Sequence, residues 1–418
     1  MTKATTDTTA RRSAEFPDDS LIGSEGVFGA VRGFVSRVRG GDLGSLPVVI
    51  GLIVIWAVFQ ILSPVFLSAS NLVNLTLQCA AVGTISIGIV LVLLVGQIDL
   101  SVGSVSGLAA AIFGVAFTQL HWNQALAIVA ALLAGAAIGL LYGLLFTRFG
   151  VPSFVITLAG LLGFFGVQLW VLGPNSSLNI PYDSWIVQFA QQMFLPPWAA
   201  YALAAVAAIG MFLTDWRRAE RRRRAGLSQG SLTVMLVKAL LVLVGLVFVV
   251  WYLSTDRGTG AMFVFFVLLV ILMNFFLTRT RWGRSVYAIG GSVEAARRAG
   301  IRVNRVYVSV FILCSSFAAL GGLLAAAKLT SVNASSGTTD VNLNAIAAAV
   351  IGGTSLFGGR GSAWSALLGI LVIQSISSGL TLLNLDSSIR FMITGAVLLL
   401  AVIIDSLSRR SRASHGQA

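Results

Sequence analysis

Few residues of this chain could carry charge inside an apolar environment, and the best candidate is Asp99. It lies in the stretch Gly96-Gln-Ile-Asp-Leu-Ser-Val-Gly-Ser104, where one apolar run ends and the next begins. A carboxylate at membrane depth can couple ion movement to transport or contact a polar solute. The same side chain could instead form a turn and cap a helix, because Asp accepts hydrogen bonds from free N–H groups at a helix start. The sequence leaves both alternatives open.

The sequence lacks the residue patterns that bind a phosphate or a metal ion. Its three lysines, Lys3, Lys238 and Lys328, follow Thr, Val and Ala, so no Gly-Lys-Ser/Thr phosphate loop exists. The two histidines, His121 and His415, cannot form a zinc site, and the two cysteines are too few for a disulfide framework. We therefore expect no enzyme activity, no catalytic residue, no metal and no cofactor in this chain. A partner or an ion gradient must supply its energy.

The stretch Ser292–Ile301 has the pattern of a short, capped helix. Ser292 is a good N-cap, Glu294 lies in the first turn, and Gly300 can end the helix. The stretch falls in the most basic loop of the chain, and a capped helix of two turns is unusual for a simple connector. Physical arguments alone leave two alternatives open, a docking element for a partner and a solvated amphipathic turn.

A glycine-rich segment follows a short apolar piece, Val341–Gly352. Five glycines fall between Gly352 and Gly361. Irregular backbone cannot face lipid, so any part of this segment at membrane depth must be buried in protein or line a cavity. The segment also matches the Asp99 stretch at an offset of 256 residues, which indicates a parallel repeat or a chance match. In this match Gly96 corresponds to Gly352, Asp99 to Ser355, Leu100 to Leu356, and Gly103 to Gly359.

The elements that must position these residues are membrane helices. Of 418 residues, 57% are hydrophobic and 10% are charged, against about 25% charged in an average soluble protein. We expect an all-α, polytopic membrane protein with ten to twelve transmembrane spans, some of them broken or re-entrant, as Val341–Gly352 must be. Runs of about 20 apolar residues mark the spans. The candidates are Leu46–Phe66, Leu72–Val95, Val102–Leu120, Ala125–Phe146, Phe154–Leu172, Trp198–Leu213, Val234–Leu253, Ala261–Leu277, Val306–Ala327, Ala363–Leu383 and Phe391–Ile404.

The distribution of positive charge predicts the topology. If both termini are cytoplasmic and all twelve segments cross, only Arg257, Lys328 and Arg390 of the 28 Lys and Arg fall outside, with Lys238 near the inner end of a span. This bias is what the positive-inside rule requires. Membrane topology therefore explains the net charge of +13 better than a nucleic-acid partner does.

The same count defines the domain organisation. Without the two spans around Arg217–Arg224, that basic cluster would fall outside. We expect a flexible cytoplasmic tail over 1–45, a transmembrane domain over 46–408 with a two-span insertion at about 197–254, and a cytoplasmic tail over 409–418. Glycines at four-residue spacing within Ala134–Gly143 indicate close helix packing, within the chain or between two copies.

Several of these stretches resemble the permease subunits of bacterial ATP-binding-cassette importers for ribose, xylose and related monosaccharides. The resemblance is carried by Gly96–Ser104, by Ile351-Gly-Gly-Thr-Ser-Leu-Phe-Gly-Gly-Arg-Gly-Ser362, and by the Glu294-Ala-Ala-Arg-Arg-Ala-Gly300 element. The last is similar to the family's coupling loop, although no Pro follows in Ile301–Leu320. Within the family, the D-xylose permeases are most similar, on Val151–Gly160 and Tyr287–Ile301.

The resemblance implies a permease in the bacterial inner membrane that moves a monosaccharide into the cytoplasm by alternating access. The monosaccharide that it implies is a pentose, and among the pentoses D-xylose. It implies a permease homodimer, an extracytoplasmic sugar-binding protein, and a cytoplasmic ATPase that binds ATP and Mg. The residues that it assigns to ATPase coupling are Ser292, Glu294, Ala295, Ala296 and Gly300. Candidate lining groups of the translocation path are Gln78, Gln97, Asp99, Ser101, Thr354 and Ser355. Each of these could equally form a hydrogen bond between helices. The alternative function is an ion-coupled secondary transporter of a small polar solute.

Overall fold

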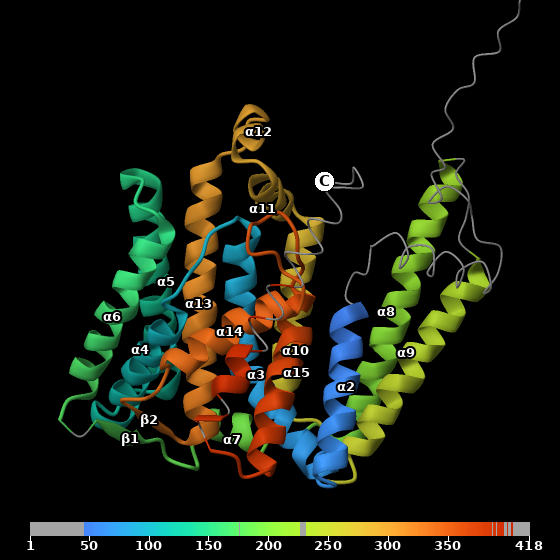
Figure 1. Cartoon of the computed structure of the whole chain (residues 1–418), viewed down its shortest axis with the longest axis horizontal. Coiled ribbons are helices and arrows are strands. Elements are labelled where there is room, and N and C mark those ends of the chain that lie inside the picture. The colour runs from blue at the N-terminus through green and yellow to red at the C-terminus, as the bar shows by residue number, and fades with distance from the viewer. Residues whose placement is uncertain are drawn as a thin grey trace, which may run out of the picture. The chain divides into compact units, whose positions relative to one another are not determined.

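The computed structural model describes residues 46–403 except 175, 226–230, 387, 390, 397, 398 and 400–402. Within this part of the chain nearly all regular structure is helical, which confirms the all-α prediction (Figure 1). Among the described residues, nine helices are long and apolar enough to cross a membrane, and two shorter apolar helices accompany them. The protein is therefore a multi-pass membrane protein. Of the predicted span Phe391–Ile404, residues 391–396 are helical, and residues 397, 398, 400–402 and 404 lie outside the described residues.

Six helices make up the first half of the described bundle, and a break over residues 95–101 separates two of them. The six helices are α2 (Leu46–Leu62), α3 (Ala69–Leu94), α4 (Val102–Gly114), α5 (Gln124–Phe149), α6 (Ser153–Leu172) and the short α7 (Trp185–Gln191). The predicted span Val102–Leu120 is composite, since α4 continues as a π-helical turn, η1 (Val115–Gln119). The chain over residues 95–101, between α3 and α4, is not helical.

The second half begins at α10 (Ala261–Arg279) and contains the other break. It continues with α11 (Arg281–Gly291), α12 (Val293–Arg298), α13 (Val303–Leu329), α14 (Thr339–Ile351) and α15 (Trp364–Leu382). As predicted for the Val341–Gly352 piece, α14 is short, and the irregular segment 352–363 separates it from α15. Two short strands, β1 (Ser177–Asn179) and β2 (Ser331–Asn333), pair antiparallel and connect the chain after α6 to the chain after α13.

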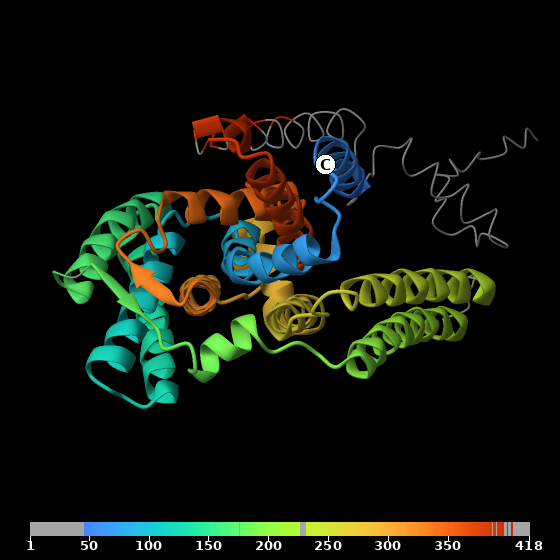
Figure 2. The same ribbon diagram turned by 90° about the horizontal axis from the view of Figure 1, so that it is seen from below.

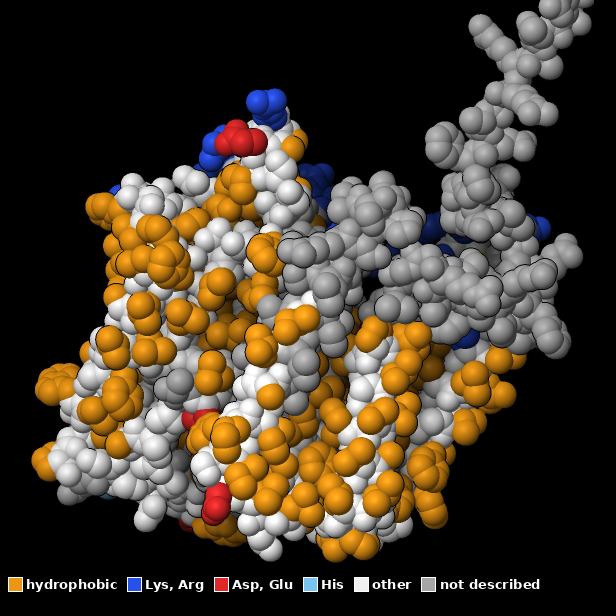
Figure 3. All heavy atoms as spheres, viewed as in Figure 1, with side chains coloured by type: hydrophobic (Ala, Val, Ile, Leu, Met, Phe, Trp, Pro, Cys, Tyr) orange, Lys and Arg blue, Asp and Glu red, His pale blue; other side chains and the backbone are white. Residues whose placement is uncertain are grey.

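Helix α3 lies at the centre of the core. It contacts α10, α13, α14 and α15, and Figure 2 shows it between α10, α13 and α15. Helix α5 packs closely on α13, because a side chain at Gly139 would overlap the backbone of Phe311. The glycines of Ala134–Gly143 therefore serve packing between helices of one chain. Helices α5 and α6 carry exposed hydrophobic side chains, such as Leu133 and Leu162, and Figure 3 shows such side chains over the side of the molecule where α6 lies.

Helices α8 (Pro197–Arg224) and α9 (Leu232–Leu253) contribute a compact unit of their own over residues 201–247. Helix α8 continues without a break through its six arginines, and Arg224 pairs with Glu220 at 3.2 Å one turn earlier. The other described helices belong to a second, larger unit, called the main unit below. In the main unit, the segment before α8 pairs with the segment after α9. The Leu195 N–H donates to Thr259 O (2.9 Å), and the Ala261 N–H donates to Met193 O (2.8 Å). The chain thus leaves and re-enters the main unit at one place.

Candidate functional site

The first candidate site is the break between α3 and α4, which contains Asp99. Helix α3 ends at Leu94, Gly96 turns the chain with φ +73°, and the backbone then lies against α6. The Ile98 N–H donates to Ser153 Oγ (3.4 Å) and the Leu100 N–H to Thr157 Oγ1 (3.2 Å). Side chains of a neighbouring helix thus satisfy backbone groups that lipid would leave unpaired.

The Asp99 side chain is buried, with 1% of its surface exposed, in a network of hydroxyl groups. Its Oδ1 accepts from the Ser101 N–H (2.8 Å) and the Ser101 hydroxyl (2.7 Å), and Tyr142 of α5 donates to that hydroxyl (2.8 Å). The Cys314 thiol of α13 lies 3.7 Å from Oδ2. Among the described residues, no Lys, Arg or His lies within 4 Å of this carboxylate.

The helix-cap alternative for Asp99 needs a correction. Asp99 forms a turn in which it accepts from Ser101, the residue before α4, and in the described structure it accepts no hydrogen bond from the first amides of the helix. Asn342 of α14 provides that bond, since its Oδ1 accepts from the Gly103 N–H. Asn342 is 4% exposed and was not identified from the sequence. Its only sequence signal is a polar residue within the apolar piece Val341–Gly352, and its partner lies 239 residues away.

The second break, 352–363, is compact. Thr354 and Ser355 are both buried, and the Ser355 N–H donates to the Arg360 carbonyl oxygen (2.9 Å). The backbone at Gly353, Gly358 and Gly359 has positive φ, which glycine adopts without strain. Gly353, Phe357 and Arg360 of the same segment are exposed, so only its part around Thr354 and Ser355 is held inside protein. That part meets the rule that irregular backbone at membrane depth must be buried or line a cavity.

The two breaks touch each other and helix α11. The Gly359 N–H donates to the Leu94 carbonyl oxygen (2.9 Å). A side chain at Gly290 of α11 would overlap backbone atoms of both Leu94 and Gly359. The Tyr287 hydroxyl of α11 donates to the Gly361 carbonyl oxygen (2.9 Å). Burial raises the pKa of Tyr287, so the hydroxyl remains protonated and able to donate at physiological pH.

Helix α12 follows α11 directly and has the local structure that the sequence predicted. Ser292 is its N-cap, accepting from the Ala295 N–H (3.3 Å), and Gly300 ends it with φ +79°. The Gly300 N–H bonds to Arg297 O (3.0 Å) and the Ile301 N–H to Ala296 O (3.1 Å), which is a Schellman ending. Charged side chains of both signs gather at this helix (Figure 3).

Most of α12 is available to a partner. Glu294 and Arg297 form an ion pair of 2.9 Å, yet their side chains are 69% and 61% exposed. Ala295 is exposed as well, whereas Ala296 is buried against the protein. The helix thus rests on the bundle through Ala296 and the partly buried Val293, and presents its charged face outward.

The six candidate path residues do not form one site. Asp99 and Ser101 share the hydroxyl network, and Thr354 and Ser355 lie in the second break. Gln97 is half-buried, with its side chain at hydrogen-bonding distance from the Tyr307 hydroxyl. Gln78 lies on an exposed face of α3, next to Gln374 of α15. The sequence also missed Gln168, a fully buried residue of α6 that donates to Ser336 O at 2.9 Å.

Comparison with known proteins identifies the class to which this architecture belongs. Residues 71–402 match the family described as branched-chain amino acid transport system, permease component. The chain belongs to this family. The permease is accordingly a transport protein and no enzyme.

Three relatives show where the permease falls within its family. It is 34% identical over 345 residues to the xylose transport system permease protein of Escherichia coli (strain K12), covering 82% of the permease and 87% of that relative. Its identity to the protein of the same description from Haemophilus influenzae is 33% over 375 residues, covering 90% and 99%. With the ribose import permease protein of Escherichia coli (strain K12) it shares 31% over 358 residues, covering 85% and 92%. No solved structure matches the permease significantly.

Proposed function

We propose that the permease is the membrane subunit of an ATP-driven importer of a monosaccharide, and that its substrate is a pentose, D-xylose. The xylose relatives have slightly higher identity than the ribose relative, 34% against 31%. The family description names branched-chain amino acids, but these relatives are named for sugars. Family membership also favours an importer subunit over the ion-coupled secondary transporter that the sequence left as an alternative.

The proposed assembly is a permease homodimer in the cytoplasmic membrane with both termini inside. An extracytoplasmic protein delivers the sugar, and an ATPase that binds ATP and Mg docks on the cytoplasmic side. In this assembly the permease itself holds no cofactor. The cytoplasmic position of α12 and of the arginines at the end of α8 follows from the positive-inside rule.

The observation that carries this proposal is the contact of α11 with both breaks. An ATPase that grips α12 through Ser292, Glu294, Ala295, Ala296 and Gly300 would move α11, because the two helices are consecutive. Movement of α11 would reach the first break at Leu94 and the second at Gly359 and Gly361. Packed interfaces switch between discrete arrangements instead of deforming smoothly. We propose that this switch opens and closes a path along the two breaks.

The residues proposed to line that path are those of the breaks and their surroundings. Asp99 and Ser101 present hydroxyl and carboxylate oxygens, and the buried Thr354 hydroxyl has no hydrogen-bond partner among the described residues. Gln97 adds a half-buried amide in the first break, and Gln78 adds an exposed amide on α3. Weak, separated polar contacts suit a permease, because it passes the sugar on and need not hold it.

The coupling role of α12 is tested with Glu294→Lys and Gly300→Val. The exposed Glu294–Arg297 pair contributes at most about 1 kcal/mol to stability. Valine at the positive φ of Gly300 costs roughly 1–3 kcal/mol of local strain. Both variants should therefore insert normally, yet lose sugar uptake and co-purify with less ATPase. Normal uptake with an intact complex would show that α12 is only a solvated turn.

A charge-matched control is Asp183→Lys. Asp183 is also exposed, but it lies between β1 and α7 on the opposite side of the bundle. This variant should retain the ATPase. Purifying the complete complex and measuring which sugar stimulates ATP hydrolysis would then test the substrate, and stimulation by a branched-chain amino acid instead would contradict the sugar proposal.

A further inference from the structure

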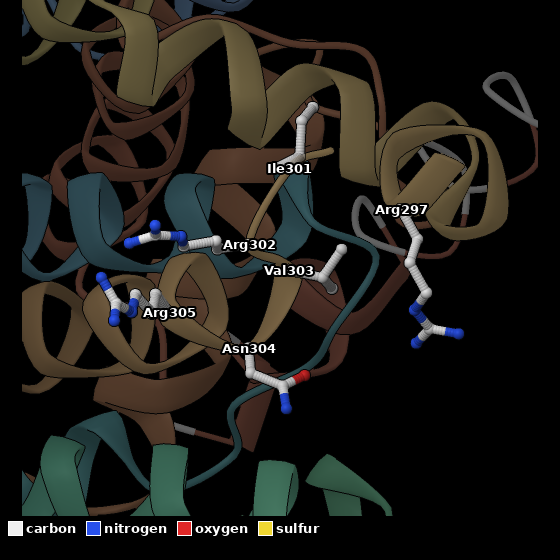
Figure 4. A pocket seen from close by; sticks show the side chains of 6 residues that line it. All are labelled: Arg297, Ile301, Arg302, Val303, Asn304 and Arg305. Atoms are coloured by element: carbon white, nitrogen blue, oxygen red, sulfur yellow. The ribbon is translucent and has the colours of Figure 1, made fainter. Parts of the chain in front are cut away.

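A hollow of about 340 Å³ lies where α12 ends and α13 begins (Figure 4). Three of the side chains that line it are arginines, and a fourth is an amide. The apolar part of the lining includes Val303, which is only 5% exposed. The lining residues are Arg297, Ile301, Arg302, Val303, Asn304 and Arg305.

The charge in this hollow is largely uncompensated. Arg302 and Arg305 point their guanidinium groups to the same side in Figure 4. Of the carboxylates in the described part of the chain, none lies within 4 Å of either group, whereas Arg297 pairs with Glu294 at 2.9 Å. Two like charges held side by side favour a ligand with several negatively charged oxygens, because guanidinium groups bind phosphate through paired N–H donors.

The start of α13 adds to this preference. Its N-cap position, Arg302, makes no side-chain cap hydrogen bond. The helix is 27 residues long, and the partial positive charge of its first turn lies among the arginines. The helix end alone would not define a ligand, but here it reinforces a hollow that is already basic.

The position of the hollow along α13 indicates where the ligand comes from. Arg305 directly precedes Val306, where the apolar run Val306–Ala327 of this spanning helix begins. The arginines are therefore at the depth of the lipid headgroups on the side that the charge bias makes cytoplasmic. An acidic side chain of a docked protein would have to reach down to this level, whereas a lipid phosphate is already there.

We propose that this hollow binds the phosphate group of an anionic phospholipid of the cytoplasmic leaflet. Arg302 and Arg305 contact the phosphate oxygens on the side to which both point in Figure 4, whereas Arg297 lies on the other side and keeps its pairing with Glu294.

The test uses the full permease chain, purified without any partner. Short-chain phosphatidylglycerol is titrated in neutral detergent, and bound lipid is counted by native mass spectrometry. The double variant Arg302→Gln/Arg305→Gln should bind roughly 30-fold more weakly, because each basic residue contributes about 1 kcal/mol at an anionic surface and 1.4 kcal/mol is a factor of 10. The matched control, Arg281→Gln/Arg298→Gln, removes two exposed charges outside the hollow and should bind as the parent does.

Three further binding arms and one folding control make the result decisive. Equal binding of phosphatidylcholine would overturn the proposal, since that lipid carries no net charge. Inorganic phosphate that competes at the same concentration as the lipid would show a free-anion site instead of a membrane site. A double variant that binds phosphatidylglycerol normally but loses a partner ATPase would assign the hollow to protein docking. Unchanged thermal melting of the double variant would confirm that the chain still folds.

Discussion

Replacement of Gly290 by Ala should disconnect α11 from the two breaks. The new Cβ would overlap backbone atoms, the Leu94 carbonyl oxygen on one side and the Gly359 amide on the other, so no side chain can move aside to admit it. Helix α11 must move away from the breaks by about 1 Å, which for overpacking costs roughly 1–3 kcal/mol. Since 1.4 kcal/mol changes an equilibrium tenfold, one arrangement of the breaks should lose roughly fivefold to 150-fold in population.

The neighbouring glycine supplies the control. A Cβ at Gly291 would have no atom within 4 Å, and this residue also lies in α11. Alanine is favoured over glycine in a helix by about 1 kcal/mol, so Gly291→Ala should be neutral or slightly stabilising. The two variants thus make the same chemical change at adjacent positions, one against the breaks and one in open space.

The assay reconstitutes the permease with its ATPase and binding protein in vesicles and measures sugar uptake together with ATP hydrolysis. Gly290→Ala should still bind the ATPase, because Ser292 to Gly300 are untouched, but uptake should fall roughly tenfold. Gly291→Ala should transport normally. Equal uptake by the two variants would refute the argument that α11 drives the breaks through this contact.

Three more outcomes follow from particular contacts. Tyr287→Phe removes the 2.9 Å hydrogen bond to Gly361 O and should lower sugar uptake several-fold, at a stability cost of about 1 kcal/mol. The control variant Tyr252→Phe removes an equivalent hydrogen bond to Leu67 O and should leave uptake unchanged. Asn342→Leu leaves the buried Gly103 N–H unpaired and should lower the free energy of unfolding by about 1–3 kcal/mol. Its control is Asn344→Leu, because Asn344 makes no side-chain hydrogen bond in the described structure. Equal melting temperatures of the two variants would contradict the capping role of Asn342. Cysteines introduced near Arg222 or Ser292 should react with thiol reagents from the cytoplasm only. The native Cys79 and Cys314 are buried and should therefore add little labelling of their own. Labelling of the introduced cysteines from outside would overturn the topology.

The sequence was sufficient for features that are determined within a few residues. The apolar runs predicted the helices, because about 20 consecutive apolar residues leave few alternatives to a membrane span. The cap at Ser292 and the ending at Gly300 were predictable, since both depend on hydrogen bonds that span at most five residues. The irregular segments after Leu94 and after Ile351 were marked by their glycines.

The arrangement of the two breaks required the tertiary structure. Leu94 and Gly359 are in contact although they lie 265 positions apart in the sequence, and Gly290 joins this contact from a third part of the chain. Such contacts depend on how helices pack, and no local pattern records the partner. For the same reason, Asn342 could not be assigned to the start of α4 from the sequence. The six candidate path residues were selected by type, which does not reveal that packing exposes Gln78 and buries Asp99 in a hydroxyl network with Tyr142.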